Sequence, residues 1–145
     1  MPIVFDIDGT FTNGDLLAGT VTIDTEFGSV TNVDLTIGLL EFHHLHFVIV
    51  GKQGRTEIQV DPSATDGDPL LRMILPVRDL VGYAGGQICS NETLSCHPTT
   101  LLTDPVVNLA TGSATAVPTV PEPATLILFG SGLIGAVASR RRTGA

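Results

Sequence analysis

The chain of 145 residues is long enough for one modest domain with its own hydrophobic core. Residues 1–119 contain four Lys and Arg against fourteen Asp and Glu, a formal charge of −10. Such an acidic body repels phosphate backbones, which argues against nucleic acid as a partner. Sixteen Gly, nine Pro, no Trp and many Thr and Val favour β-structure with tight turns over helix.

Alternating apolar and polar residues predict a series of β-strands along the body. The apolar residues expected to share one face of successive strands are Ile3, Phe5 and Ile7; Val21 and Ile23; Val33, Leu35 and Ile37; and Leu45, Phe47 and Ile49. Residues 55–60 repeat the pattern, and Gly-, Asn- and Asp-rich turns separate the runs. Residues 70–83 are ambiguous, but Pro76 limits any helix there, which favours strand. The sequence therefore predicts an all-β fold, an antiparallel β-sandwich-like domain over residues 1–113.

The first strand runs into Asp6, Asp8, Gly9 and Thr10, and this stretch resembles the start of the haloacid-dehalogenase phosphotransferases. The resemblance implies Asp6 as nucleophile and Asp8 as general acid. That fold requires parallel strands joined by helices, whereas strand follows strand here with connections too short for crossover helices. The only Lys is Lys52, and no Asp-Asp pair is available for Mg²⁺. We therefore predict that the chain is not an enzyme and needs no cofactor, with a small phosphatase using Asp6 and Asp8 as the alternative.

Histidines in the stretch 41–47 have the chemistry of metal ligands. His44 and His46 are expected on one face of a strand, with His97 as a candidate third ligand. Nothing in the sequence brings His97 or Glu41 close to them. The favoured interpretation is a solvent-facing polar stripe, and we predict no metal site.

The loop 61–69 contains Asp61, Asp66 and Asp68, and clustered carboxylates on a loop bind Ca²⁺ outside cells. The spacing fits no calcium loop of fixed pattern, so an acidic turn is favoured. A calcium-binding surface module stays an alternative. A carbohydrate-binding module is a further one, weakly supported because the chain has one Tyr and no Trp to present to a sugar.

The two cysteines, Cys89 and Cys96, enclose a segment of eight residues. A disulfide between them suits an oxidising compartment. Two independent thiols in a loop are the alternative, which the sequence leaves open.

The last part of the chain changes character at residue 114. Residues 114–119 are a Pro/Thr-rich spacer, which is stiff and extended. Residues 124–138 then contain no charge, and as a helix this run is about 22 Å long, enough for a marginal membrane span. Arg140, Arg141 and Arg142 follow directly, and Lys/Arg clusters stay cytoplasmic. We expect a single C-terminal transmembrane helix in the lipid bilayer, with the C-terminus inside the cell and the acidic body outside as an ectodomain.

Residues 120–143 resemble the PEP-CTERM sorting signal of Gram-negative bacteria, because Pro121, Glu122 and Pro123 precede the Gly-bearing apolar run and the Arg cluster. The resemblance implies that an exosortase, a membrane-embedded cysteine protease, recognises these three residues and processes the chain. It also implies an exported structural or adhesive protein of the cell envelope, first anchored in the inner membrane and then surface-bound or extracellular. Exopolysaccharide is a possible partner by the same resemblance.

Exported proteins of this class begin with a signal peptide. Residues 1–30 contain neither a basic n-region nor an apolar h-region of 7–15 residues. We expect either a start codon upstream of Met1 or a leader that has been removed.

Overall fold

The computed structural model describes residues 1–62, 69–93 and 95–119. Within these residues the chain forms ten strands and no helix. The strands are β1 (Pro2–Phe11), β2 (Leu16–Asp24), β3 (Ser29–Ile37), β4 (Leu40–Phe42), β5 (His44–Lys52), β6 (Arg55–Asp61), β7 (Leu70–Leu75), β8 (Gly85–Gln87), β9 (Thr100–Leu102) and β10 (Val107–Ala116).

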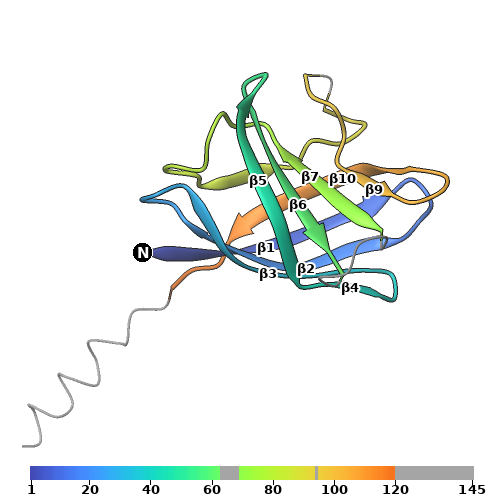
Figure 1. Ribbon diagram of the computed structural model, residues 1–145, viewed down its shortest axis with the longest axis horizontal. Helices are drawn as coiled ribbons and strands as arrows, with labels where there is room; N and C mark the ends of the chain where they lie inside the picture. Colours follow the sequence, from blue (N-terminus) through green and yellow to red (C-terminus); the bar gives the residue numbers. More distant parts are fainter. Residues whose placement is uncertain (63–68, 94, 120–145) are drawn as a thin grey trace, which may run out of the picture.

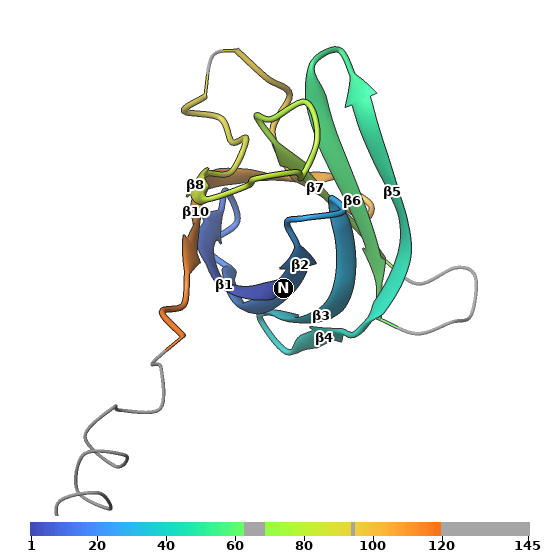
Figure 2. The ribbon, with the colours of Figure 1, turned by 90° about the vertical axis from the view of Figure 1, so that its left-hand side faces the viewer.

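The strands form one antiparallel sheet in the order β4-β3-β2-β1-β10-β9-β7-β6-β5, with β8 paired to β10. The sheet curls on itself into a nearly closed barrel, which is clearest in the view of Figure 2. Its two edge strands, β4 and β5, are separated in the chain by His43 alone, and β5 approaches β3 where the curl ends. The predicted all-β antiparallel fold is confirmed, with one curled sheet in place of two separate layers.

Strand β10 joins the two halves of the sheet (Figure 1). Its start, Val107 and Asn108, pairs with β9, whereas its continuation from Leu109 pairs with β1. Pairing with β1 continues to Ala116, three residues past the boundary expected at residue 113. The chain then leaves the barrel after Val117, whose backbone N–H donates to the carbonyl of Val4 at 2.8 Å.

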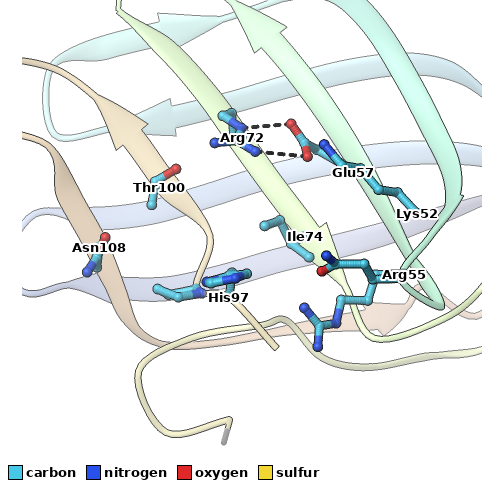
Figure 3. Close-up of a pocket in the computed structure, with 10 residues that line it drawn as sticks. Lys52, Arg55, Glu57, Arg72, Ile74, His97, Thr100 and Asn108 are labelled. Carbon is cyan, nitrogen blue, oxygen red and sulfur yellow. Dashed lines mark hydrogen bonds and ion pairs between the residues drawn. The ribbon is translucent and has the colours of Figure 1, made fainter. Parts of the chain in front are cut away.

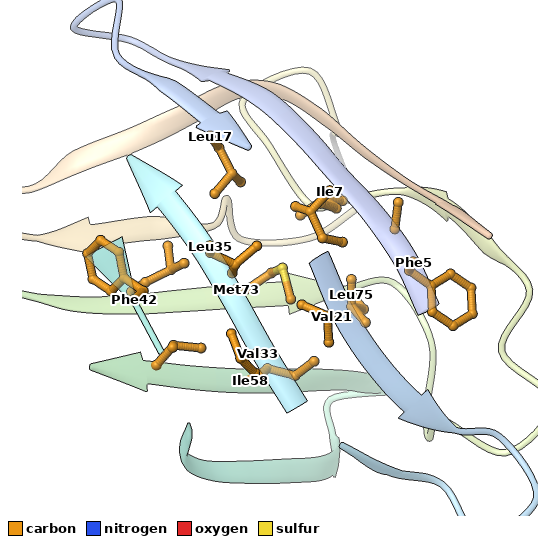
Figure 4. Close-up of a cluster of buried hydrophobic side chains, with 14 of the residues drawn as sticks. Phe5, Ile7, Leu17, Val21, Val33, Leu35, Phe42, Ile58, Met73 and Leu75 are labelled. Carbon is orange, nitrogen blue, oxygen red and sulfur yellow. The ribbon is translucent and has the colours of Figure 1, made fainter. Parts of the chain in front are cut away.

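The core lies inside the curl, where alternate side chains of every long strand meet (Figure 4). Labelled there are Phe5, Ile7, Leu17, Val21, Val33, Leu35, Phe42, Ile58, Met73 and Leu75. All ten are buried. The faces predicted from the alternation in residues 3–7, 21–23 and 33–37 are therefore confirmed, with Ile3 only partly buried.

Strand β2 approaches β3 closely at Gly19, which has φ of +129° and pairs with Leu35. A Cβ atom at this position would lie 2.1 Å from the backbone oxygen of Asp34. Only glycine fits both the backbone conformation and the contact.

The face predicted for Leu45, Phe47 and Ile49 is wrong beyond Leu45. Leu45 pairs with Val60 and Phe47 with Gln59, so one extra residue bulges out of β5 at His46. Because side chains alternate with a period of two, the extra residue reverses the faces of the remainder of the strand. Val48 packs on the core, while Phe47 is 45% exposed.

The ambiguous stretch 70–83 is a strand only as far as Leu75. Pro76 ends β7, and residues 76–83 form bends and turns that lead to Tyr83. The Tyr83 ring packs on Phe5, with ring centroids 5.0 Å apart. Burial raises the pKa of Tyr83 to about 12.

None of the described residues lies in a helix long and apolar enough to cross a membrane. The apolar run 124–138, for which a transmembrane helix is expected, lies outside the described residues.

Candidate functional site

A pocket of about 490 Å³ opens on the outer face of β6, β7, β9 and the start of β10. Its floor is Ile74, which points away from the core, and the segment 88–99 forms one wall through His97 (Figure 3). Pro98 of the same segment also lines the pocket. The residues around it are Lys52, Gln53, Arg55, Glu57, Arg72, Ile74, His97, Pro98, Thr100 and Asn108. The volume is that of a small-molecule site.

The wall of the pocket is fixed to β7 by hydrogen bonds at Ile74. The Ile74 carbonyl accepts from the N–H of Cys89 at 2.9 Å, and the Ile74 N–H donates to Thr99 Oγ1 at 2.9 Å. The Thr99 N–H in turn donates to the Cys89 carbonyl at 2.7 Å. A disulfide joins Cys89 to Cys96, so the segment leaves and returns to the same point on the sheet.

Glu57 and Arg72 form an ion pair in the pocket. Arg72 Nε donates to Glu57 Oε1 at 2.7 Å and Arg72 Nη2 donates to Oε2 at 3.0 Å, a bidentate geometry. The hydrogen bonds from Arg72 hold the pKa of the Glu57 carboxyl below its usual value, although burial opposes this. The same hydrogen bonds raise the pKa of Arg72. Both groups therefore stay charged at neutral pH.

Two further cations lie at the β5–β6 hairpin. Gln53 and Gly54 both have positive φ, 55° and 75°, as a tight two-residue turn requires. The turn places Lys52 opposite Arg55 at the rim of the pocket. Arg55 Nη2 donates to the backbone carbonyl of Ser95, which ties the hairpin to the wall segment. With one carboxylate against Lys52, Arg55 and Arg72, the pocket has a formal charge of +2.

Thr100 supplies a polar group without a partner. Its Oγ1 is buried and has no hydrogen-bond partner among the described residues. A buried hydroxyl in this state is uncommon in a folded protein, because desolvating it without a compensating bond is unfavourable. The hydroxyl is enclosed by the protein, although Thr100 as a residue belongs to the pocket lining beside the cations.

Asp6 and Asp8 lie on the outer face of β1, exposed to solvent and away from the pocket. Asp8 Oδ2 accepts a hydrogen bond from Ser113 Oγ at 3.2 Å. No cation lies within ion-pair distance of either carboxylate among the described residues. The antiparallel sheet also lacks the parallel strand ends on which the phosphatase alternative depends.

His44 and His46 both turn to Asp61, with their Nδ1 atoms 3.7 and 2.9 Å from its Oδ2. The bulge at His46 brings the two rings to one carboxylate. His97 belongs to the pocket beside Lys52, at the other end of β5. In residues 1–62, 69–93 and 95–119, no three His, Cys, Asp or Glu side chains are placed to hold a metal ion.

Glu41 forms contacts with a different histidine. Its Oε2 lies 3.4 Å from His43 Nε2, and the other ring nitrogen of His43 lies 3.1 Å from Asp34. Of the three carboxylates considered for Ca²⁺, Asp61 faces the two histidines, and Asp66 and Asp68 lie outside the described residues.

The residues of the expected sorting signal also lie outside the described part of the chain. They are Pro121, Glu122, Pro123, Arg140, Arg141 and Arg142. Comparison with known families covers this segment.

Residues 1–119 have a formal charge of −10, and an apolar run and an arginine cluster follow them in the sequence. Residues 119–142 match the family model of the PEP-CTERM protein-sorting motif. The chain therefore carries a PEP-CTERM sorting motif, as the resemblance implied. Proteins with this motif are exported, directed to the cell envelope and recognised by an exosortase. No curated protein and no solved structure matches the chain.

The cationic pocket was not predicted from the sequence. Lys52, Arg55 and Arg72 come from three different strands, and no local motif links them. One signal was present: residues 1–119 contain only four Lys and Arg, so each of them is conspicuous in an acidic body.

Proposed function

We propose that the chain is a non-catalytic structural or adhesive protein of the bacterial surface, processed by an exosortase. Residues 124–138 insert into the inner membrane, with Arg140–Arg142 on the cytoplasmic side. The exosortase then binds Pro121, Glu122 and Pro123 and cleaves nearby, after which the body is anchored at the surface or released. Exopolysaccharide is a proposed neighbour of the mature protein.

The observation that carries this proposal is the sorting motif at residues 119–142. Two prolines around Glu122 keep the segment from entering the following helix, because a residue before proline is biased to extended conformations. An extended peptide at the membrane surface is a form that a protease can bind. A single Lys in the whole chain and the exposure of Asp6 and Asp8 support a body without catalysis.

Processing is tested by expressing the chain behind a functional signal peptide in an exosortase-positive host and in a matched strain without exosortase. We expect mass spectrometry to find a C-terminus near residue 123 in the first host only. The matched variant Glu122→Ala should accumulate unprocessed in both. An intact tail in the exosortase-positive host would contradict the proposal.

The non-catalytic part is tested separately with a panel of phosphate esters and Mg²⁺. We expect no turnover by the wild-type protein. Turnover that disappears in Asp6→Asn would establish the phosphatase alternative instead.

A further inference from the structure

The distribution of positive charge in the body is uneven. Three of the four Lys and Arg residues of positions 1–119 line one pocket, and fourteen acidic residues are spread over the same body. Among the pocket residues the only carboxylate is that of Glu57, which is already paired. Anions are therefore repelled by most of the surface and attracted to this pocket.

The cations keep donors that the protein does not use. The Glu57 carboxylate accepts hydrogen bonds from Nε and Nη2 of Arg72, and the Ser95 carbonyl accepts one from Nη2 of Arg55. A guanidinium has five N–H donors, so these bonds leave several donors unused on each of the two lining arginines. Lys52 adds an ammonium at the rim, and the Glu57 pair holds the Arg72 side chain in a fixed orientation.

The remaining lining favours an organic ligand over a bare inorganic ion. Ile74 is an apolar residue at the centre of the pocket (Figure 3), and Pro98 is a second apolar residue of the lining. Thr100 and Asn108 lie on the side away from the hairpin, where Asn108 supplies an amide that can donate and accept hydrogen bonds. A space of about 490 Å³ is also larger than a phosphate ion needs.

We propose that this pocket binds a small organic anion whose carboxylate or phosphate lies among Lys52, Arg55 and Arg72, with a hydroxyl-bearing part near Asn108. The apolar floor at Ile74 contacts the carbon skeleton of the ligand. This inference rests on the body alone and is independent of how the sorting motif is processed.

The test uses the full-length chain in a non-ionic detergent, with calorimetric titration at low and at physiological salt. The probes are glucuronate, glucose 6-phosphate and glucose, which share a sugar skeleton and carry a carboxylate, a phosphate or no charge. We expect saturable binding of one or both charged sugars, weaker at higher salt, and none of glucose. The two charged probes distinguish a carboxylate ligand from a phosphate ester.

Two variants locate the site. Lys52→Gln removes an exposed rim charge and should weaken binding about two- to fivefold. Asn108→Ala removes the polar side chain on the side of the pocket away from the hairpin and should weaken binding about three- to tenfold. A purely structural role of Asn108 would leave affinity unchanged.

The matched control is Arg78→Gln, which removes one positive charge outside the pocket lining and should leave affinity within about twofold. The proposal is overturned if neither charged sugar binds or if glucose binds as tightly as they do. It is also overturned if Arg78→Gln weakens binding as much as Lys52→Gln, or if Asn108→Ala has no effect on affinity.

Discussion

Inward and outward residues alternate in both halves of the barrel, but the outer faces of the two halves differ in their exposure to solvent. On β1–β3 the outward residues include Asp6, Asp8 and Asp34, all exposed. On β6 and β7 the outward residues include Glu57 and Ile74, both buried and both in the pocket lining. One half faces water directly, and the other faces a pocket.

The difference shows that burial decides whether a carboxylate needs hydrogen-bond partners from the protein. A carboxylate on the open face, such as Asp6, is solvated by water and needs no protein partner. The Glu57 side chain is 8% exposed and therefore needs partners: two hydrogen bonds come from Arg72, and Gln59 donates a third at 2.6 Å. The same two hydrogen bonds hold the Arg72 side chain in the pocket lining.

The largest effect is expected where the open half depends on close backbone approach. Gly19→Ala should lower the free energy of unfolding by about 3 kcal/mol or more, because the added Cβ meets the Asp34 carbonyl and the backbone has positive φ. Denaturant unfolding measures it. The control Gly14→Ala also has positive φ but meets no atom within 4 Å, so it should cost only about 1 kcal/mol. Equal effects of the two variants would argue against the close approach.

The next largest effect concerns the segment 88–99, which contains the disulfide and forms a wall of the pocket. Replacing both Cys89 and Cys96 by Ser should lower the free energy of unfolding by about 2–3 kcal/mol, the amount expected for so short a closed loop. Proteolysis within 88–99 should also become faster. The wild-type protein in reductant serves as the control and should show the same loss. Unchanged stability in both would mean that the hydrogen bonds at Ile74 hold this segment alone.

A pair of matched carboxylate substitutions compares the two faces directly. Glu57→Gln should lower the free energy of unfolding by about 1–3 kcal/mol, because Arg72 loses its ionic partner in a partly buried site. Asp6→Asn on the open face should change it by less than about 0.5 kcal/mol. Denaturant unfolding at neutral pH measures both, and a similar cost at the two positions would remove the distinction between the faces.

The smallest effect is the pH dependence of the Glu57–Arg72 pair. The folded-state pKa of Glu57 is lowered from an unfolded value near 4.5, so the pair contributes fully above about pH 4.5. Its contribution is lost as the pH falls through the lower folded-state pKa. The difference in stability between the wild-type protein and Glu57→Gln should therefore shrink below pH 4.5. A constant difference down to pH 3 would show that Glu57 does not titrate with folding.

Much of the fold could be predicted from local pattern. The inward faces of β1, β2 and β3 follow from strict alternation. The strand favoured over residues 70–83 is present only as far as Leu75, where Pro76 ends β7. The bulge at His46 could not be predicted, because an extra residue leaves the composition of the strand unchanged while it reverses the faces beyond it. Phe47 therefore faces solvent, against expectation.

The sequence by itself determined the sorting motif at 119–142, because a sorting signal is defined by the order of its parts along the chain. It also determined the antiparallel all-β class, since a period of two is a local property. Only the tertiary structure decided that Lys52, Arg55 and Arg72 meet in one pocket, while Asp6 and Asp8 stay apart from it. Pairing between strands distant in sequence set those positions, and side-chain patterns within one strand carry no information about which partner strand lies beside it.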